Sequence, residues 1–169
     1  MPTERVSPMT ACRNTARAFL CVLFLAASTL AADPAAAPAP SAKDKCPVCG
    51  MFVAKYPDWL ASSRLKDGTT YFFDGPRDMF SHYLDLPRYA RGKQQADITS
   101  LAVKEYYSLK TIDARNAFFV IGSDVYGPMG AELVPFTTKK DATAFMADHR
   151  GKRIVRFSDV TPQLLKSLK

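Results

Sequence analysis

The segment Cys46-Pro47-Val48-Cys49-Gly50-Met51 carries the side chains best suited to chemistry. Two thiolates three positions apart can converge on one metal ion, and the thioether of Met51 can join them. Cysteine and methionine sulfurs are soft, polarisable donors that favour Cu(I) over harder ions. The segment therefore predicts a Cu(I) site with Cys46, Cys49 and Met51 as ligands.

Three other roles stay open for the cysteine pair. A structural zinc site normally needs four ligands, but no second CxxC follows and the chain has only two histidines, His82 and His149. A thioredoxin-like redox pair needs the motif at the start of a helix after a strand, which the Pro and Gly in and after this motif do not favour. A passive disulfide suits an exported chain, although closing so short a loop adds little stability. Ligand softness and loop length favour copper over these alternatives.

A second segment, 124–132 (DVYGPMGAE), places Met129 between Gly-Pro and Gly, a pattern typical of tight turns. A core methionine normally belongs to a periodic apolar face, so a thioether held on a turn indicates a ligand, with gap-filling in the core as the alternative. Glu132 is either an acceptor that supports the ligands, a docking residue, or a solvated residue beside the turn. His82, on a predicted helix, is a possible remote ligand.

The elements that must position these side chains follow a repeated order. The expected strands are 59–65, 69–74, 98–109, 117–121, 132–136 and 153–157, and helices are expected to begin near Pro76, Thr138 and Thr161. Asp67-Gly68 predicts a hairpin turn, and Phe72 and Phe118 are expected to face the core. This order, strand–strand–helix–strand twice, predicts an α+β fold built as a pseudo-duplicate, with units of roughly 46–109 and 110–169.

The first 45 residues are expected to serve export. Two arginines precede the apolar run 18–27, and small residues follow it, so residues 1–32 are typical of a cleaved signal peptide. The run is shorter than the ~20 residues of a membrane span. Residues 33–45, rich in Ala and Pro, predict a flexible linker before the domain 46–169. No cysteine stands where lipid attachment requires one, so we expect a soluble exported protein that touches the membrane only if the signal stays uncleaved.

Composition and charge exclude several classes of function. The 169 residues are 47% hydrophobic and 23% charged, which excludes a disordered chain. The net charge of +7 comes from basic residues spread along the sequence, so a nucleic-acid partner is not expected. No nucleophile–base arrangement, phosphate loop or acid–base pair stands out. We therefore expect a carrier and not an enzyme.

The two sulfur segments and their surroundings resemble the NosL family, the accessory proteins of nitrous oxide reductase. The likeness lies in CPVCGMFVAKYPDW (46–59), YFFDGPRDMFSHYL (71–84), KTIDARNAFFVIGSDVYGPMGAELVPF (110–136) and HRGKRIVRF (149–157). The combination of CxxCGM with MG-x-E-x-(I/V)-P-F is specific to the family.

The resemblance implies a periplasmic Cu(I) protein with two strand–strand–helix–strand units. It also implies delivery of copper to apo nitrous oxide reductase, in denitrification. Copper binding in the family maps onto Cys49, Met51 and Met129, with Cys46 as an extra thiol. Two functions of other classes remain open, a thiol–disulfide protein that uses Cys46 and Cys49, and a structural domain with a passive disulfide.

Overall fold

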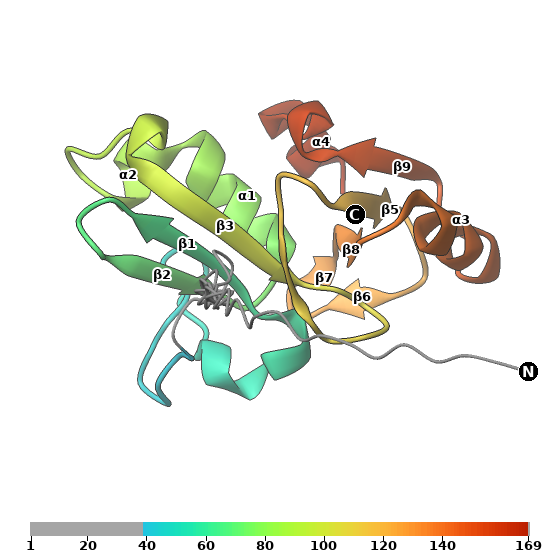
Figure 1. Ribbon diagram of the computed structural model, residues 1–169, viewed down its shortest axis with the longest axis horizontal. Coiled ribbons are helices and arrows are strands. Elements are labelled where there is room, and N and C mark those ends of the chain that lie inside the picture. Colours follow the sequence, from blue (N-terminus) through green and yellow to red (C-terminus); the bar gives the residue numbers. More distant parts are fainter. Residues whose placement is uncertain (1–38, 169) are drawn as a thin grey trace, which may run out of the picture. The chain divides into compact units, whose positions relative to one another are not determined.

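A computed structural model describes residues 39–168 (Figure 1). The predicted signal peptide, 1–32, and the first part of the predicted linker, 33–38, lie outside the described residues. At the other end of that linker, Lys45 already pairs with Phe52 in an isolated antiparallel bridge. No helix within the described part has the length and apolar character needed to cross a membrane.

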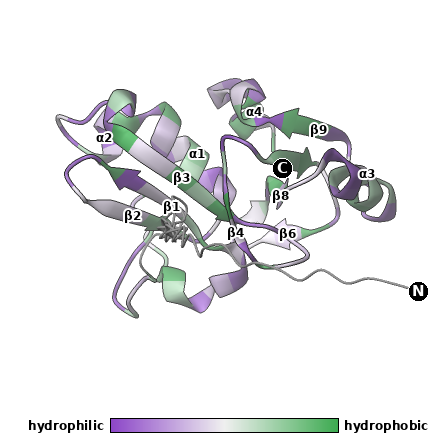
Figure 2. Ribbon diagram, viewed as in Figure 1, coloured by the Kyte–Doolittle hydropathy of each residue, from purple (hydrophilic) through white to green (hydrophobic). Residues whose placement is uncertain are grey.

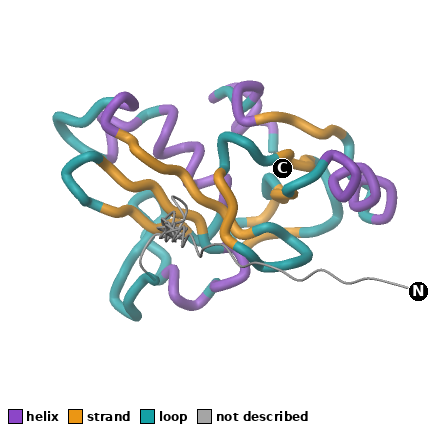
Figure 3. Tube along the Cα trace, in the orientation of Figure 1, coloured by secondary structure: helices purple, strands orange, loops and turns teal. Residues whose placement is uncertain are grey.

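The N-terminal unit is built on a four-stranded antiparallel sheet in the order β2-β1-β3-β4. Helix α1 packs against β1 and β2, and Gly68, with φ of +86°, makes the predicted hairpin turn between them. Two 3-10 turns, Val53–Lys55 and Pro57–Trp59, precede the sheet (Figure 3). The elements are β1 (Ala61–Leu65), β2 (Thr70–Phe73), α1 (Pro76–Leu84), α2 (Leu86–Tyr89), β3 (Ile98–Lys104) and β4 (Thr111–Asp113).

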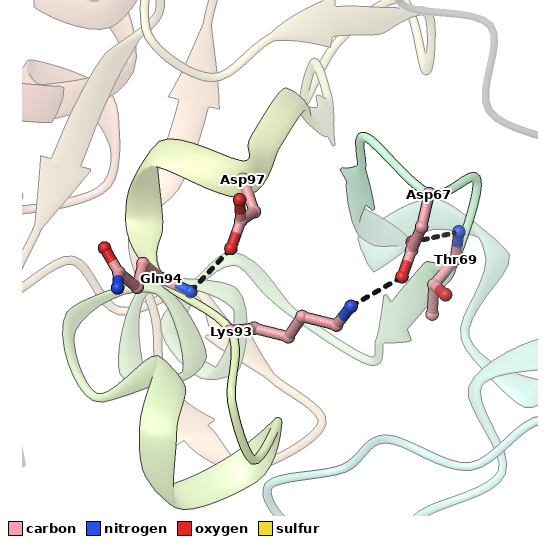
Figure 4. Close-up of polar contacts among 5 residues, drawn as sticks. All are labelled: Asp67, Thr69, Lys93, Gln94 and Asp97. Atoms are coloured by element: carbon pink, nitrogen blue, oxygen red, sulfur yellow. Dashed lines mark hydrogen bonds and ion pairs between the residues drawn. The ribbon is translucent and has the colours of Figure 1, made fainter.

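The turn between β1 and β2 is tied to the loop before β3 (Figure 4). The Lys93 ammonium lies 2.7 Å from the Asp67 carboxylate, and the Thr69 N–H donates to the same carboxylate at 2.9 Å. The hydrogen bond from Lys93 lowers the pKa of Asp67 to about 2. In the loop itself the Gln94 N–H donates to Asp97 at 2.9 Å. These exposed contacts fix the far end of the sheet, away from the sulfur segments.

The C-terminal unit is built on a three-stranded antiparallel sheet in the order β8-β5-β9. A short separate hairpin, β6 with β7, lies between β5 and β8 in the chain. The Thr138 hydroxyl accepts the Asp141 N–H at the start of α3, and Thr161 caps α4 in the same way, as predicted. The elements are β5 (Phe118–Ile121), β6 (Tyr126–Gly127), β7 (Gly130–Ala131), β8 (Val134–Phe136), α3 (Lys139–Asp148), β9 (Arg153–Arg156) and α4 (Pro162–Ser167).

The two units repeat one topology, so the fold is α+β and pseudo-duplicated as the sequence predicts. In each unit the first strand is central, β1 in one and β5 in the other. It pairs on one side with the strand that precedes the helix, β2 or β8. On the other side it pairs with the strand that follows the helix, β3 or β9. The order of the pairing, and not only the order of elements, is thus the same in both units.

One apolar core joins the units. The ring of Phe80, on α1, lies 5.2 Å from that of Phe119, on β5, and 5.0 Å from that of Phe157. A second, smaller cluster fills the space between α3 and the β8-β5-β9 sheet, in which the central strand β5 is hydrophobic throughout (Figure 2). The shared core packs the two units against each other.

The expectation that Phe72 and Phe118 face the core is confirmed only in part. Both are half-buried and pack against the apolar clusters, whereas their neighbours Phe73 and Phe119 are fully buried. Adjacent strand residues face opposite sides of a sheet, so a run of two phenylalanines does not reveal which one faces inward. The Arg156 guanidinium lies 4.0 Å above the Phe118 ring, which stabilises that ring at the surface.

The predicted strand 98–109 also ends early, at Lys104. The chain turns back through 105–109 and returns as β4, which pairs with β3. The Glu105 carboxylate accepts the Ser108 N–H at 2.6 Å, and Leu109 adopts a positive φ of +56°. These contacts close a tight turn that contains no glycine. The sequence therefore gives no turn signal here, and the aromatic residues of the segment suggest a continuing strand.

Candidate metal centre

The segment 46–51 forms a closed loop that presents both thiols together. The Cys46 N–H donates to the Met51 carbonyl at 2.9 Å, and the Gly50 N–H donates to the Cys46 carbonyl at 2.9 Å. Gly50 adopts a φ of +82°, which favours glycine at this turn. The bridge between Lys45 and Phe52 closes the base of the loop. Both cysteines of the loop are free thiols, Cys46 buried and Cys49 half-buried.

Each thiol meets a carboxylate at the start of α1. Cys46 Sγ lies 3.2 Å from Asp78 Oδ2, and Cys49 Sγ lies 3.2 Å from Asp74 Oδ1. Asp74 follows β2 directly and Asp78 lies in the first turn of α1, so the end of a strand and the start of a helix aim both groups at the loop. One ligand atom from each of the four residues lies within 4.8 Å of the other three. This arrangement can hold one metal ion.

The surroundings of the thiols keep them protonated. Burial raises the pKa of the Cys46 thiol far above its usual value. Burial also raises the pKa of Cys49 to about 12, with a further contribution from the carboxylates of Asp74 and Asp78. Burial raises the pKa of Asp78 as well. An ion that occupies the site must therefore displace thiol protons, which selects for a metal with a strong preference for sulfur.

Asp74 and Asp78 were not among the predicted site residues. In the sequence, two acidic residues in Asp-Gly-Pro-Arg-Asp read as charges that favour a helix N-terminus. The signal that indicates a site is their position, because one ends a buried strand and the other lies four residues later on the helix that follows. The second oxygen of Asp74 is buried without a hydrogen-bond partner among residues 39–168, so it remains available as an acceptor.

The two predicted methionine ligands occupy different environments. Met51 is half-buried at the end of the thiol loop. Met129 lies at the turn of the β6–β7 hairpin and is 47% exposed, so it is not a gap-filling core residue. Gly130, with φ of +94°, makes the tight turn that the sequence predicts. The structure thus places one thioether beside the thiols in the chain and the other on an exposed turn of the C-terminal unit.

Glu132 is buried, with 3% of its surface exposed, so it is not the solvated residue that the sequence left open. Its Oε1 atom accepts the Arg77 N–H at 2.6 Å and the Leu133 N–H at 2.8 Å. Burial raises the pKa of this carboxyl to about 8. A residue that follows the Met129 hairpin therefore caps the helix on which Asp78 lies.

His82 lies on α1 one turn beyond Asp78 but does not belong to the group of four. It is fully buried, and its ring lies 4.7 Å from the ring of Tyr71 and 5.0 Å from that of Phe73. Neither ring nitrogen has a hydrogen-bond partner among the described residues, and burial lowers the pKa of His82 to about 4. The structure thus places this predicted remote ligand in an aromatic pocket.

Comparisons with known proteins agree on one family. The NosL family model matches residues 37–165. A curated relative from Stutzerimonas stutzeri, the copper-binding lipoprotein NosL, is 28% identical over 129 residues, which cover 73% of this chain. The match spans only 65% of that relative. The crystal structure of the copper chaperone NosL from Shewanella denitrificans is 30% identical and superposes with a TM-score of 0.64, covering 78% of this chain and 99% of that one.

Proposed function

The chain belongs to the NosL family, and from that premise we propose that it is a Cu(I) carrier and not an enzyme. The observation that carries the proposal is the pair of free thiols held together by a closed loop at the start of α1. Two of its relatives are named for copper binding or copper delivery.

The proposed ligands are sulfur atoms from both units. Cys46 and Cys49 supply two thiolates, and Met51 and Met129 supply thioethers. Thiolate and thioether donors suit Cu(I), whereas the carboxylates of the site suit harder ions. Asp74 and Asp78 accept hydrogen bonds from the thiols before the ion binds, and they hold the sulfurs in place.

Release of the ion needs a ligand that a partner can replace. Met129 meets this need because it lies on an exposed turn and its thioether carries no charge. A donor from the recipient can bind the ion before Met129 leaves. We propose that the recipient is apo nitrous oxide reductase, because the resemblance to NosL proteins implies delivery of copper to that enzyme.

The proposal includes export. Residues 1–32 direct the chain to the periplasm, where cleavage of the signal releases a soluble protein. The relative from Stutzerimonas stutzeri is named a lipoprotein, so the alternative is a lipid-anchored mature chain. The intact mass of protein recovered from the periplasmic and membrane fractions distinguishes the two, because an acylated N-terminus adds the mass of its fatty acids.

The raised pKa values of both thiols disfavour the rival thiol–disulfide function. The attacking species in disulfide exchange is a thiolate. The pKa of Cys49 is raised to about 12, and that of the more buried Cys46 is raised as well. Neither sulfur is therefore activated as a redox nucleophile.

Anaerobic titration of the reduced protein with Cu(I), against a competing chelator, tests the proposal. We expect one tight site per chain by native mass spectrometry. Cys49→Ser should abolish the site and Met129→Leu should weaken it. Met146→Leu, a substitution on the half-buried face of α3, is the matched control and should change nothing. Unchanged affinity in both Cys49→Ser and Met129→Leu would remove the carrier proposal.

A further inference from the structure

The carboxylate of Glu132 packs closely against two glycines from different parts of the chain, Gly75 and Gly127. A Cβ atom at Gly75 would clash with Glu132 Oε2, and one at Gly127 would lie 3.0 Å from the same atom. Neither glycine has a positive φ, so the backbone does not demand glycine at either position. Space for the carboxylate is the physical reason for glycine at both positions.

The same carboxylate joins the two units by hydrogen bonds. Its Oε1 atom accepts the Arg77 N–H, a donor in the first turn of α1 that has no partner within the helix. In return, the Arg77 guanidinium donates to the Ala131 carbonyl on β7 at 3.3 Å. The β6–β7 hairpin is thus fastened to the start of α1 from both sides.

The fastened turn of α1 is also the one that contacts the thiols. Gly75 directly follows Asp74, which binds Cys49, and Arg77 directly precedes Asp78, which binds Cys46. On the other side, Glu132 follows Met129 by three residues, and its carboxylate contacts the hairpin again at Gly127. The Glu132 carboxylate and the first turn of α1 therefore connect the hairpin that carries Met129 with the residues that contact the two thiols.

We propose that Glu132 is a positioning residue that holds Met129 in register with the two thiols, so that the Met129 sulfur can complete the Cu(I) site. This inference rests on the proposed function, because it takes Met129 as a Cu(I) ligand. Glu132 itself makes no contact with the ion in this proposal. Without the carboxylate, the hairpin keeps its own pairing of Tyr126 with Ala131 and the hydrogen bond from the Arg77 guanidinium to the Ala131 carbonyl. It loses the hydrogen bond to the Arg77 N–H, which fixes its position against the first turn of α1. Met129 then no longer contributes to the affinity for Cu(I).

A double-mutant cycle on Cu(I) affinity tests this coupling. We expect Glu132→Ala and Met129→Leu each to weaken binding about tenfold or more, the effect typical of groups that orient metal ligands. The double variant should be no weaker than either single variant, because both remove the same sulfur from the site. X-ray absorption should show one fewer sulfur neighbour around copper in Glu132→Ala, as in Met129→Leu.

Two further variants separate positioning from loss of folding. Glu132→Gln keeps an oxygen that can accept the Arg77 N–H and should retain most of the affinity. Gly127→Ala leaves the carboxylate in the chain but fills its space, so it should behave like Glu132→Ala. It also replaces Glu132→Ala in the cycle if that variant does not fold.

Glu105→Ala is the matched control. Glu105 is likewise a buried glutamate, 5% exposed, whose carboxylate accepts a backbone N–H at 2.6 Å, but it lies in the turn after β3. Its substitution should lower the melting temperature and leave the Cu(I) affinity unchanged. Additive losses in the double variant, or parental affinity in both Glu132→Ala and Gly127→Ala, would overturn the positioning role while leaving the carrier function intact. If Met129→Leu binds Cu(I) as the parent does, the proposed ligand set itself falls.

Discussion

The buried imidazole of His82 predicts an acid-dependent loss of stability that one substitution removes. Burial lowers the pKa of His82 from 6.5 to about 4. Between these values the unfolded chain binds a proton that the folded chain does not, so stability falls as the pH falls from 6.5 to 4. A difference of about 2.5 pKa units corresponds to about 3 kcal/mol. Above pH 6.5 this contribution is fully present.

The measurement must be a difference between variants, because Glu132 acts in the opposite sense. Burial raises the pKa of Glu132 to about 8, so the folded chain binds the extra proton there, and stability falls as the pH rises from 4.5 to 8. The two contributions overlap between pH 4.5 and 6.5 in the parent protein. Subtracting the curve of His82→Phe from that of the parent cancels the Glu132 contribution and leaves the histidine alone.

Urea unfolding of the reduced, metal-free protein at steps from pH 8 to pH 4 gives these curves. Trp59, the chain's single tryptophan, reports the transition because its ring lies 6.4 Å from that of Tyr106 across the fold. The stability of the parent relative to His82→Phe should drop by about 3 kcal/mol from pH 6.5 to pH 4. A His149→Gln variant, which removes the other histidine, should keep the parental loss. A difference that stays flat over this range would show that protonated His82 finds a partner or water, and the reasoning from burial would be wrong.

Three other substitutions test local features. Thr138→Ala removes the cap of α3 and should cost about 1 kcal/mol in urea unfolding, which Thr138→Ser should largely restore. Gly151→Ala should destabilise by about 1–3 kcal/mol, because its Cβ would lie 2.6 Å from Val120 Cγ1; a melting temperature equal to the parent's would contradict this packing. Asp78→Asn removes a carboxylate that raises the pKa of Cys49, so iodoacetamide should alkylate Cys49 faster at pH 8, and an unchanged rate would mean that burial alone sets this pKa.

The sequence predicts the order of elements because local signals mark most of their ends. Threonine caps at Thr138 and Thr161 and the Asp67-Gly68 turn are where the sequence indicates them. The turn at 105–109 could not be predicted, since it depends on a side-chain contact of Glu105 and on a leucine with positive φ. In β2 and in β5 the sequence does not reveal which of two adjacent phenylalanines is the more deeply buried, because either one fits the alternation of a strand.

The candidate site could be predicted only in part, for a similar reason. The spacing of Cys46 and Cys49 is visible in the chain, and so is the turn that exposes Met129. Asp74 and Asp78 follow these cysteines by 25 and 32 residues, and their role appears only when the thiol loop folds back on α1. Burial of Glu132 depends on space left by two glycines, Gly127 in the adjacent hairpin and Gly75, which lies 57 residues earlier at the start of α1.

The protonated state of the thiols also bears on how the empty protein survives exposure to oxygen. Peroxide and molecular oxidants attack the thiolate form of cysteine, and sulfenic acid and disulfide products follow from it. Cys46 and Cys49 both carry a proton shared with a carboxylate, and the first is almost wholly shielded from solvent. The metal-free protein should therefore keep its sulfurs in the reduced state without help from a dedicated reductant.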